Sequence, residues 1–174
     1  MTAQVLIPDN VDQIAIDMLA RTDGIAVNAP GKLERAQALL DVADAEALVI
    51  RSGIQVDAEL IAQAKNLKVI ARAGVGVDNV DLAAATARGI VVMNTPGGNT
   101  VSTAEHTVGL MLALARHIPQ GHASMVAGRW DRKLYMGVEL RGKTLGVVGF
   151  GRIGRAVAKR AQAFNMNVIA FDPY

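Results

Sequence analysis

The chain has 174 residues, which is enough for one domain and part of a second. Its 51% of apolar and 20% of charged residues exclude an intrinsically disordered chain. The formal net charge of +2 is too small to favour a nucleic acid or a membrane surface as partner, and the absence of cysteine excludes disulfides, thiolate metal sites and thiol nucleophiles.

The first part of the chain alternates short β-branched runs with segments rich in Ala and Leu. The apolar runs predict five strands, at residues 5–7, 25–27, 48–50, 69–71 and 90–93. The intervening segments predict four helices, at residues 11–20, 32–40, 57–64 and 78–87. We expect Ile14, Met18 and Leu19 to share one face of the first helix, and Asp57 to cap the third.

This alternation indicates the fold class. Apolar strands that alternate with helices are typical of a parallel sheet covered on both faces. Because crossovers between parallel strands are right-handed, the sequence predicts a doubly wound, five-stranded, flavodoxin-like α/β domain. The Pro- and Gly-containing segment 94–99 interrupts the pattern, so we place one domain at residues 1–98 and a second at 99–174.

The second part begins with the longest helical pattern in the chain. We expect a linking helix over residues 103–118, with Ser102 and Glu105 at capping-box spacing and Pro119 ending it. An irregular, partly basic arm is predicted for residues 120–142. A strand, a helix and a strand then follow, at residues 145–148, 152–164 and 168–171.

A G-x-G-x-x-G motif joins this strand to this helix. Gly149 permits a tight turn, Gly151 lets the backbone approach a pyrophosphate, and Gly154 lets helix and strand pack closely. The helix N-terminus would meet the pyrophosphate with free amides. Asp172, at the end of the next strand, would accept hydrogen bonds from a ribose and repel a 2′-phosphate, which favours NAD over NADP. The alternative interpretation is an ordinary turn with structural glycines.

A second glycine loop, residues 72–78, connects the fourth strand to a helix that Asp78 would cap. Its small residues leave backbone N–H groups free to hold a carboxylate, and Arg72 adds a charged group with two parallel donors. Arg51 and Ser52 follow the third strand at the same edge of the sheet. The alternative is that both arginines are solvated loop residues.

The three histidines have no carboxylate at an orienting spacing, and no set of metal ligands is apparent in the sequence. We therefore predict neither a catalytic histidine nor a metal site in these residues.

These motifs resemble those of the NAD-dependent D-2-hydroxyacid dehydrogenases. The resemblance covers nearly the whole chain and rests on residues 51–53, 72–81, 94–100, 102–107 and 143–154. It implies a substrate domain followed by a Rossmann domain, in an enzyme that transfers a hydride between NAD and a 2-hydroxy acid. The residues that it assigns to the substrate are Arg51, Ser52, Arg72, Gly74, Val75, Gly76 and Asn99, and those that it assigns to NAD are Gly149, Gly151, Arg152, Ile153, Gly154 and Asp172.

The resemblance also implies a substrate and a partner. With Arg51 and Arg72 facing a phosphate, it favours a phosphorylated acid such as 3-phosphoglycerate, an intermediate of serine biosynthesis. A dehydrogenase of the glycerate, hydroxypyruvate or lactate type is the alternative. Residues 102–142 resemble the dimer contact of the family, so a homodimer is expected.

The family's catalytic histidine, its carboxylate partner and its arginine would lie beyond Tyr174. We therefore expect half of a Rossmann domain, no catalytic residue, weak or absent NAD binding, and no activity of this chain alone.

Unpaired apolar strands predict pairing with a second copy. A non-catalytic, self-assembling flavodoxin-like unit is the alternative. Without an apparent signal peptide or spanning run, the sequence predicts a cytoplasmic location.

Overall fold

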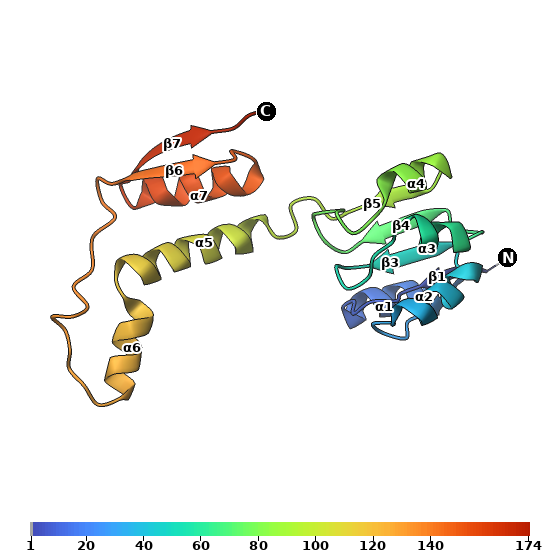
Figure 1. Ribbon diagram of the computed structural model, residues 1–174, viewed down its shortest axis with the longest axis horizontal. Coiled ribbons are helices and arrows are strands. Elements are labelled where there is room, and N and C mark those ends of the chain that lie inside the picture. The colour runs from blue at the N-terminus through green and yellow to red at the C-terminus, as the bar shows by residue number, and fades with distance from the viewer. Residues whose placement is uncertain (1) are drawn as a thin grey trace. The chain divides into compact units, whose positions relative to one another are not determined.

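The computed structural model describes residues 2–174, which form two compact units (Figure 1). The first unit ends at Gly98, and the second spans Asn99–Tyr174. None of the helices in the described residues combines the length and the apolar character that a membrane crossing needs. The cytoplasmic location stays a prediction.

The first unit is built on a five-stranded parallel sheet with strand order β2-β1-β3-β4-β5. Its strands are β1 (Ala3–Leu6), β2 (Ile25–Asn28), β3 (Ala47–Ile50), β4 (Val69–Arg72) and β5 (Val91–Met93). This order is that of flavodoxin-like sheets and confirms the predicted fold class. All five predicted strands are present, although β1 begins earlier than predicted and ends before Ile7.

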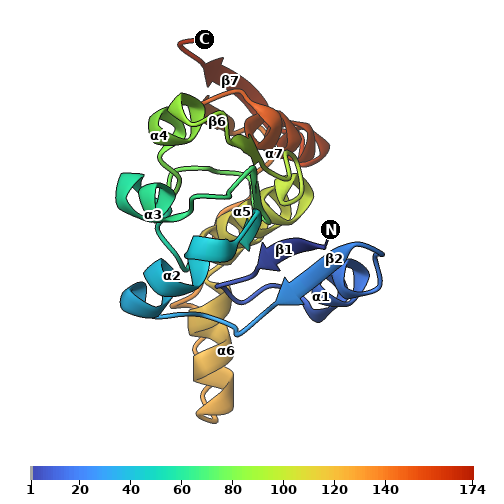
Figure 2. The same ribbon diagram turned by 90° about the vertical axis from the view of Figure 1, so that its right-hand side faces the viewer.

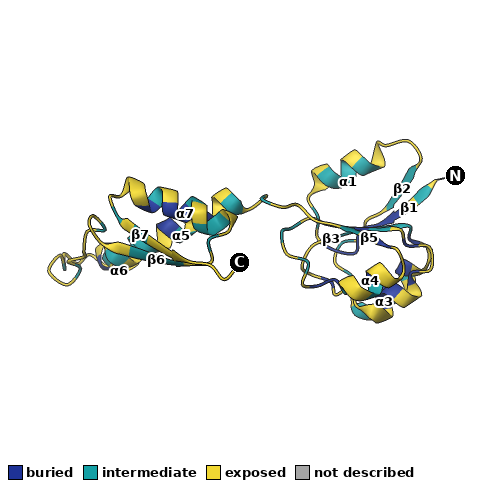
Figure 3. Cartoon of the chain, turned by 90° about the horizontal axis from the view of Figure 1, so that it is seen from above, coloured by how far each residue is buried: buried dark blue, intermediate teal, exposed yellow. Residues whose placement is uncertain are grey.

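The helices of this unit lie on both faces of the sheet, with α1 on one side and α2, α3 and α4 on the other (Figures 2 and 3). Their bounds are α1 (Gln13–Ala20), α2 (Arg35–Asp41), the short 3-10 helix η1 (Val42–Asp44), α3 (Ala58–Gln63) and α4 (Leu82–Ala87). The main core lies on the α2–α4 side, where fully buried residues such as Leu48, Ile50, Leu60 and Ile70 pack together.

The side of α1 that faces the sheet differs from the prediction. Ile14 and Met18 are exposed, while Ile16 and Leu19 are half-buried. The more buried side of the helix therefore carries Ile16 and Leu19, so Leu19 does not share the exposed face of Ile14 and Met18 as predicted.

The cap of α3 is confirmed and the cap of α4 is corrected. The Asp57 carboxylate accepts a hydrogen bond from the Leu60 N–H (3.0 Å), and this bond, with the Arg35 guanidinium, lowers the pKa of that carboxyl although burial opposes it. At α4 the cap is Asp81, which accepts from the Ala84 N–H (2.9 Å), and not Asp78. The helix starts later because Val80 forms a β-bridge with Val56.

The second unit contains a two-stranded parallel sheet and three helices. Its elements are α5 (Thr100–Ala115), α6 (Ile118–Val126), β6 (Thr144–Val148), α7 (Arg152–Ala163) and β7 (Asn167–Phe171). Helix α5 packs against α7 through Ala104, Val108 and Val157. The predicted strand–helix–strand run is thus present.

Two predictions about the long helix are wrong. Helix α5 begins at Thr100, so Ser102 lies inside its first turn and donates to the Asn99 carbonyl instead of forming a capping box. Glu105 forms an ion pair with Arg160 (3.1 Å). The segment after Pro119 was predicted to be irregular, but Pro119 stands in the first turn of α6. Proline is tolerated there because the N–H groups of the first turn have no partner within the helix.

One face of the β6–β7 sheet is left uncovered in this unit. Leu145 and Val147 alternate along β6 with Gly146 and Val148, and the side of Leu145 packs against the helices. On the other side Val148 is 87% exposed. In β7, Ile169 and Phe171 are also exposed, and their register pairs them with Gly146 and Val148. These residues form an apolar surface, which we call the open sheet face.

Candidate functional site

Two loops of the first unit meet at the carboxyl ends of β3 and β4. They are the Arg51 loop, residues 51–54, and the glycine loop, residues 72–78, and together we call them the anion site. The Ala73 N–H donates to the Ile50 carbonyl (2.8 Å), which continues the pairing of the strands into the loops. Asn79 then connects them, because its amide accepts from the Arg72 Nε–H (2.8 Å) and donates to the Arg51 carbonyl (2.7 Å). The structure therefore brings together the predicted residues Arg51, Ser52 and Arg72.

The glycine loop presents free amides at this edge. The Gly74 carbonyl accepts from the Thr95 N–H (2.9 Å), and the Val75 carbonyl accepts from the Asn94 side chain (2.7 Å). Within residues 2–174 the N–H groups of Val75 and Gly76 donate to no other group. With its carbonyls occupied and its amides free, the loop is suited to hold an anion.

The two arginines have different environments. The Arg72 side chain is only 11% exposed and lies against Gly74, where an added Cβ would come within 2.5 Å of its Nη1. Its Nη2 is 3.9 Å from the Asp78 carboxylate. Arg51 is exposed, and its Nη1 is 3.4 Å from the Asn10 carbonyl. The alternative interpretation, in which both arginines are solvated loop residues, is therefore wrong for Arg72, whereas Arg51 is solvent-exposed.

Asp9, Asn79 and Asn94 take part in this edge and were not predicted as site residues. Asp9 is buried at the end of the segment after β1, and its carboxylate accepts from the N–H groups of Arg51 (2.9 Å) and Gly53 (2.8 Å). The sequence did contain a signal for each of them: Asp9 and Asn94 are polar residues shortly after apolar strands, and Asn79 lies within the glycine motif. The pattern did not show that these side chains contact residues far away in the sequence.

Asn99, the remaining predicted substrate residue, belongs to the second unit. It stands at the N-cap of α5, where its backbone carbonyl accepts from Ser102 and Thr103. Its side chain caps no helix N–H.

The G-x-G-x-x-G motif has the geometry that the sequence predicts for a turn between strand and helix. Gly149 has φ 89°, which favours glycine. A Cβ on Gly154 would lie 2.2 Å from the Gly149 carbonyl oxygen, whereas a Cβ on Gly151 would meet nothing within 4 Å. Close packing at Gly154 and open space at Gly151 are both compatible with a dinucleotide site.

The start of α7 offers unpaired amides. The N–H of Arg155 donates to the Gly151 carbonyl (3.0 Å), and no side chain caps the helix. Among the described residues, the N–H groups of Arg152, Ile153 and Gly154 have no partner, as expected for a first turn. Asp172 is exposed nearby, and its carboxylate accepts from the Phe150 N–H at 2.5 Å.

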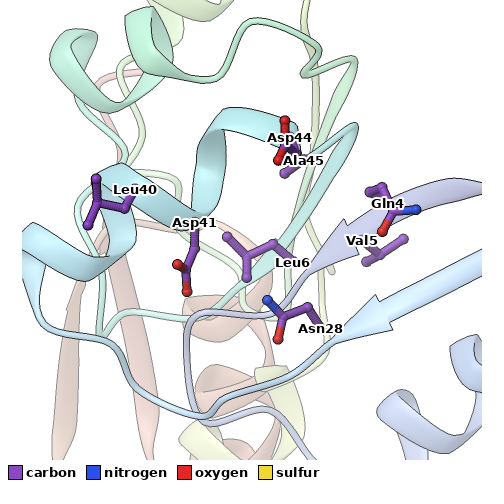
Figure 4. Close-up of a pocket in the computed structure, with 8 residues that line it drawn as sticks. All are labelled: Gln4, Val5, Leu6, Asn28, Leu40, Asp41, Asp44 and Ala45. Carbon is purple, nitrogen blue, oxygen red and sulfur yellow. The ribbon is translucent and has the colours of Figure 1, made fainter.

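A well-formed pocket of the first unit lies elsewhere (Figure 4). It has a volume of about 320 Å³ and is lined by Gln4, Val5, Leu6, Asn28, Leu40, Asp41, Asp44 and Ala45. Its two carboxylates do not suit an anion, and it shares no residue with the two loops. Within residues 2–174, no group of three or more His, Asp or Glu side chains is arranged to hold a metal ion.

Known proteins with a similar sequence support a common family. Residues 5–172 match the family described as D-isomer specific 2-hydroxyacid dehydrogenase, catalytic domain. The D-3-phosphoglycerate dehydrogenase of Archaeoglobus fulgidus is 54% identical over 98% of this chain. The match covers 32% of that relative, so the chain spans about a third of the length of the curated relatives that it matches.

Solved structures agree with this comparison. A crystal structure of a Thermus thermophilus protein has a TM-score of 0.90 and 43% identity over 98% of this chain and 56% of that one. The NAD⁺-bound 3-phosphoglycerate dehydrogenase of Entamoeba histolytica has a TM-score of 0.79 and 28% identity over 99% of this chain and 55% of that one. The chain therefore belongs to the D-isomer specific 2-hydroxyacid dehydrogenase family.

Proposed function

We propose that the chain comprises the substrate domain and the first part of the NAD-binding domain of a D-3-phosphoglycerate dehydrogenase. The reaction is hydride transfer between NAD and 3-phosphoglycerate or its oxidised form, 3-phosphohydroxypyruvate, in serine biosynthesis. The observation that carries the proposal is the pair of free amides at Val75 and Gly76 beside Arg72 and Arg51. The relatives named above as D-3-phosphoglycerate dehydrogenases favour this substrate.

In the proposed complex the two ends of the substrate have different partners. The amides of Val75 and Gly76 hold the carboxylate, since neutral donors suffice for a single negative charge. The phosphate lies toward Arg51 and Arg72, whose guanidinium groups donate several hydrogen bonds to its oxygens. Ser52 supplies a further hydroxyl donor. The role of Asn99, which belongs to the second unit, stays a prediction.

The second unit is proposed to hold NAD. Gly149, Gly151 and Gly154 shape the turn, and the free amides of Arg152 and Ile153 bind the pyrophosphate. The Asp172 carboxylate accepts hydrogen bonds from the ribose hydroxyls. When bound, NAD supplies the hydride acceptor.

We further propose that residues 1–174 alone do not complete the reaction and bind NAD weakly at best. The family resemblance assigns its acid–base histidine and its arginine to positions beyond Tyr174, and the chain covers a third of its curated relatives. With NADH and 3-phosphohydroxypyruvate supplied, the expected result is no oxidation of NADH above the rate without protein. Turnover at a rate proportional to protein concentration would contradict this proposal.

The substrate proposal is tested by titrating the ¹⁵N-labelled chain with 3-phosphoglycerate and, separately, with D-lactate. Amide signals of Val75 and Gly76 should shift with both ligands. The change Arg51→Ala should weaken 3-phosphoglycerate binding about tenfold or more, as expected for a lost charge-assisted hydrogen bond, and leave D-lactate binding unchanged.

Arg21→Ala is the control, because it removes the same charge from an exposed residue at the end of α1. Equal losses in the two variants would show a non-specific charge effect. Equal losses for the two ligands would exclude a phosphate contact at Arg51.

The open sheet face favours a second function, self-assembly. Val148, Ile169 and Phe171 expose apolar surface beside unpaired strand edges, which single soluble domains usually cover. We propose that the chain forms a homodimer through these strands and through residues 102–142. Light scattering at micromolar concentration should give the mass of a dimer.

Val148→Lys should weaken this association at least tenfold, because it places a charge within an apolar contact. Gln162→Lys is the control, since it adds the same charge at an exposed position of α7. A wild-type chain that is monomeric at this concentration would contradict the dimer, and an unchanged Val148→Lys dimer would exclude the strands as its contact.

A further inference from the structure

Asn79 lies between the two loops of the anion site and uses both of its side-chain N–H donors as well as its amide oxygen. It is 6% exposed. Its Oδ1 accepts from the Arg72 Nε–H (2.8 Å), and its Nδ2 donates to the carbonyls of Arg51 and Ile54, both at 2.7 Å. One side chain thus joins the guanidinium of the last residue of β4 to the loop that follows β3.

Asp9 holds the same loop from the other side. Its carboxylate, in a residue that is 5% exposed, accepts from the N–H groups of Asn10, Arg51 and Gly53. A Cβ on Gly53 would come within 2.5 Å of the Asp9 Oδ1, so the close approach depends on glycine there. Asn79 binds the carbonyls of the Arg51 loop, and Asp9 binds its amides.

We propose that Asn79 is a positioning residue which, together with Asp9, fixes Arg72 and the Arg51 loop in their anion-binding arrangement before the ligand arrives. This inference rests on the proposed function. An arginine side chain has several rotatable bonds, and ordering them on binding reduces affinity. With its Nε–H donated to Asn79, Arg72 retains one orientation, and its two Nη groups form no hydrogen bond within residues 2–174, although Nη2 lies 3.9 Å from the Asp78 carboxylate.

The chemistry of this position requires an amide. The side chain must accept from a cation and donate to two carbonyls at once, and among small side chains only asparagine does both. Aspartate would keep the acceptor for Arg72 but would place an oxygen against the carbonyls of Arg51 and Ile54. Alanine would remove all three hydrogen bonds.

The test is Asn79→Ala in the 174-residue chain, followed by NMR. In the ligand-free wild type, the Arg72 Nε–H signal should exchange slowly with water, and in Asn79→Ala it should exchange at the rate of a free arginine. Titration with 3-phosphoglycerate should show binding about tenfold weaker than that of the wild type.

Asp81→Ala is the matched control. Asp81 lies two residues away and caps α4, so its loss destabilises the same region without touching Arg72 or the Arg51 loop. This variant should keep both the slow Nε–H exchange and the wild-type affinity. If Asn79→Ala does not fold, Asp9→Asn replaces it, because that change keeps the shape of the side chain but, in either orientation of the amide, sets an NH₂ group against at least one of the N–H donors that the carboxylate now binds. It should weaken binding by a similar factor.

Each outcome decides the inference. Unchanged 3-phosphoglycerate affinity in Asn79→Ala, or equal losses in Asn79→Ala and Asp81→Ala, would overturn the positioning role while leaving the proposed function intact. Rapid exchange of the Arg72 Nε–H in the ligand-free wild type would also overturn the positioning role, because Asn79 would then not hold this group. A wild-type chain that binds neither 3-phosphoglycerate nor inorganic phosphate at these loops would instead refute the proposed function, and the positioning role with it.

Discussion

Gly154→Ala is expected to destabilise the second unit by about 1–3 kcal/mol or more, the usual range for a side chain forced into a packed site. The added Cβ would lie 2.2 Å from the Gly149 carbonyl oxygen and 3.2 Å from the Val147 Cγ1. The first contact is with backbone, which cannot swing aside as a side chain can. Relief therefore requires α7 to move away from β6.

Hydrogen exchange followed by mass spectrometry measures this effect, because it reports the stability of peptides from each unit separately, and two units need not unfold together. Gly146→Ala is the control. A Cβ on Gly146, in the middle of β6, would meet nothing within 4 Å, so the change should be neutral or slightly stabilising. Equal protection in the two variants would contradict the close approach of α7 to the turn.

The elements of the fold were predictable because their signals are local. Apolar runs marked all seven strands, and the glycine turn at residues 149–154 was recognised from three positions in one short segment. The errors arose where two local signals compete. Ser102 and Glu105 have the spacing of a capping box, but the chain already turns into helix at Asn99, and Pro119 is as compatible with the start of a helix as with its end.

The support of the anion site was not predictable in the same way. Asp9 contacts the loop of Arg51 across 42 residues, and Asn79 contacts the carbonyl of Arg51 across 28. Such contacts follow from the order of the strands, which places the ends of β1, β3 and β4 side by side. The sequence identified Arg72 as a site residue, but its burial beneath the glycine loop follows from the missing Cβ of Gly74.

The position of the core is tested by a second substitution with a large expected effect. Ile70→Ala should destabilise the first unit by about 2–5 kcal/mol, the range for truncating a buried isoleucine. Ile70 is 0% exposed and stands in β4 between Leu48 of β3 and Val92 of β5. Because β4 ends in Arg72, the same change should also loosen the loops of the anion site.

Met93→Ala is the matched control for Ile70→Ala. Met93 belongs to the neighbouring strand β5, pairs with Ala71, and is 50% exposed on the opposite face of the sheet. Its truncation should therefore cost less than about 1 kcal/mol, which hydrogen exchange of peptides from the first unit can resolve from the larger effect. If Met93→Ala destabilised the unit as much as Ile70→Ala, the face beside α1 would be a second buried core in solution. The α2–α4 side would then not be the main source of the stability that holds Arg51 and Arg72 in place.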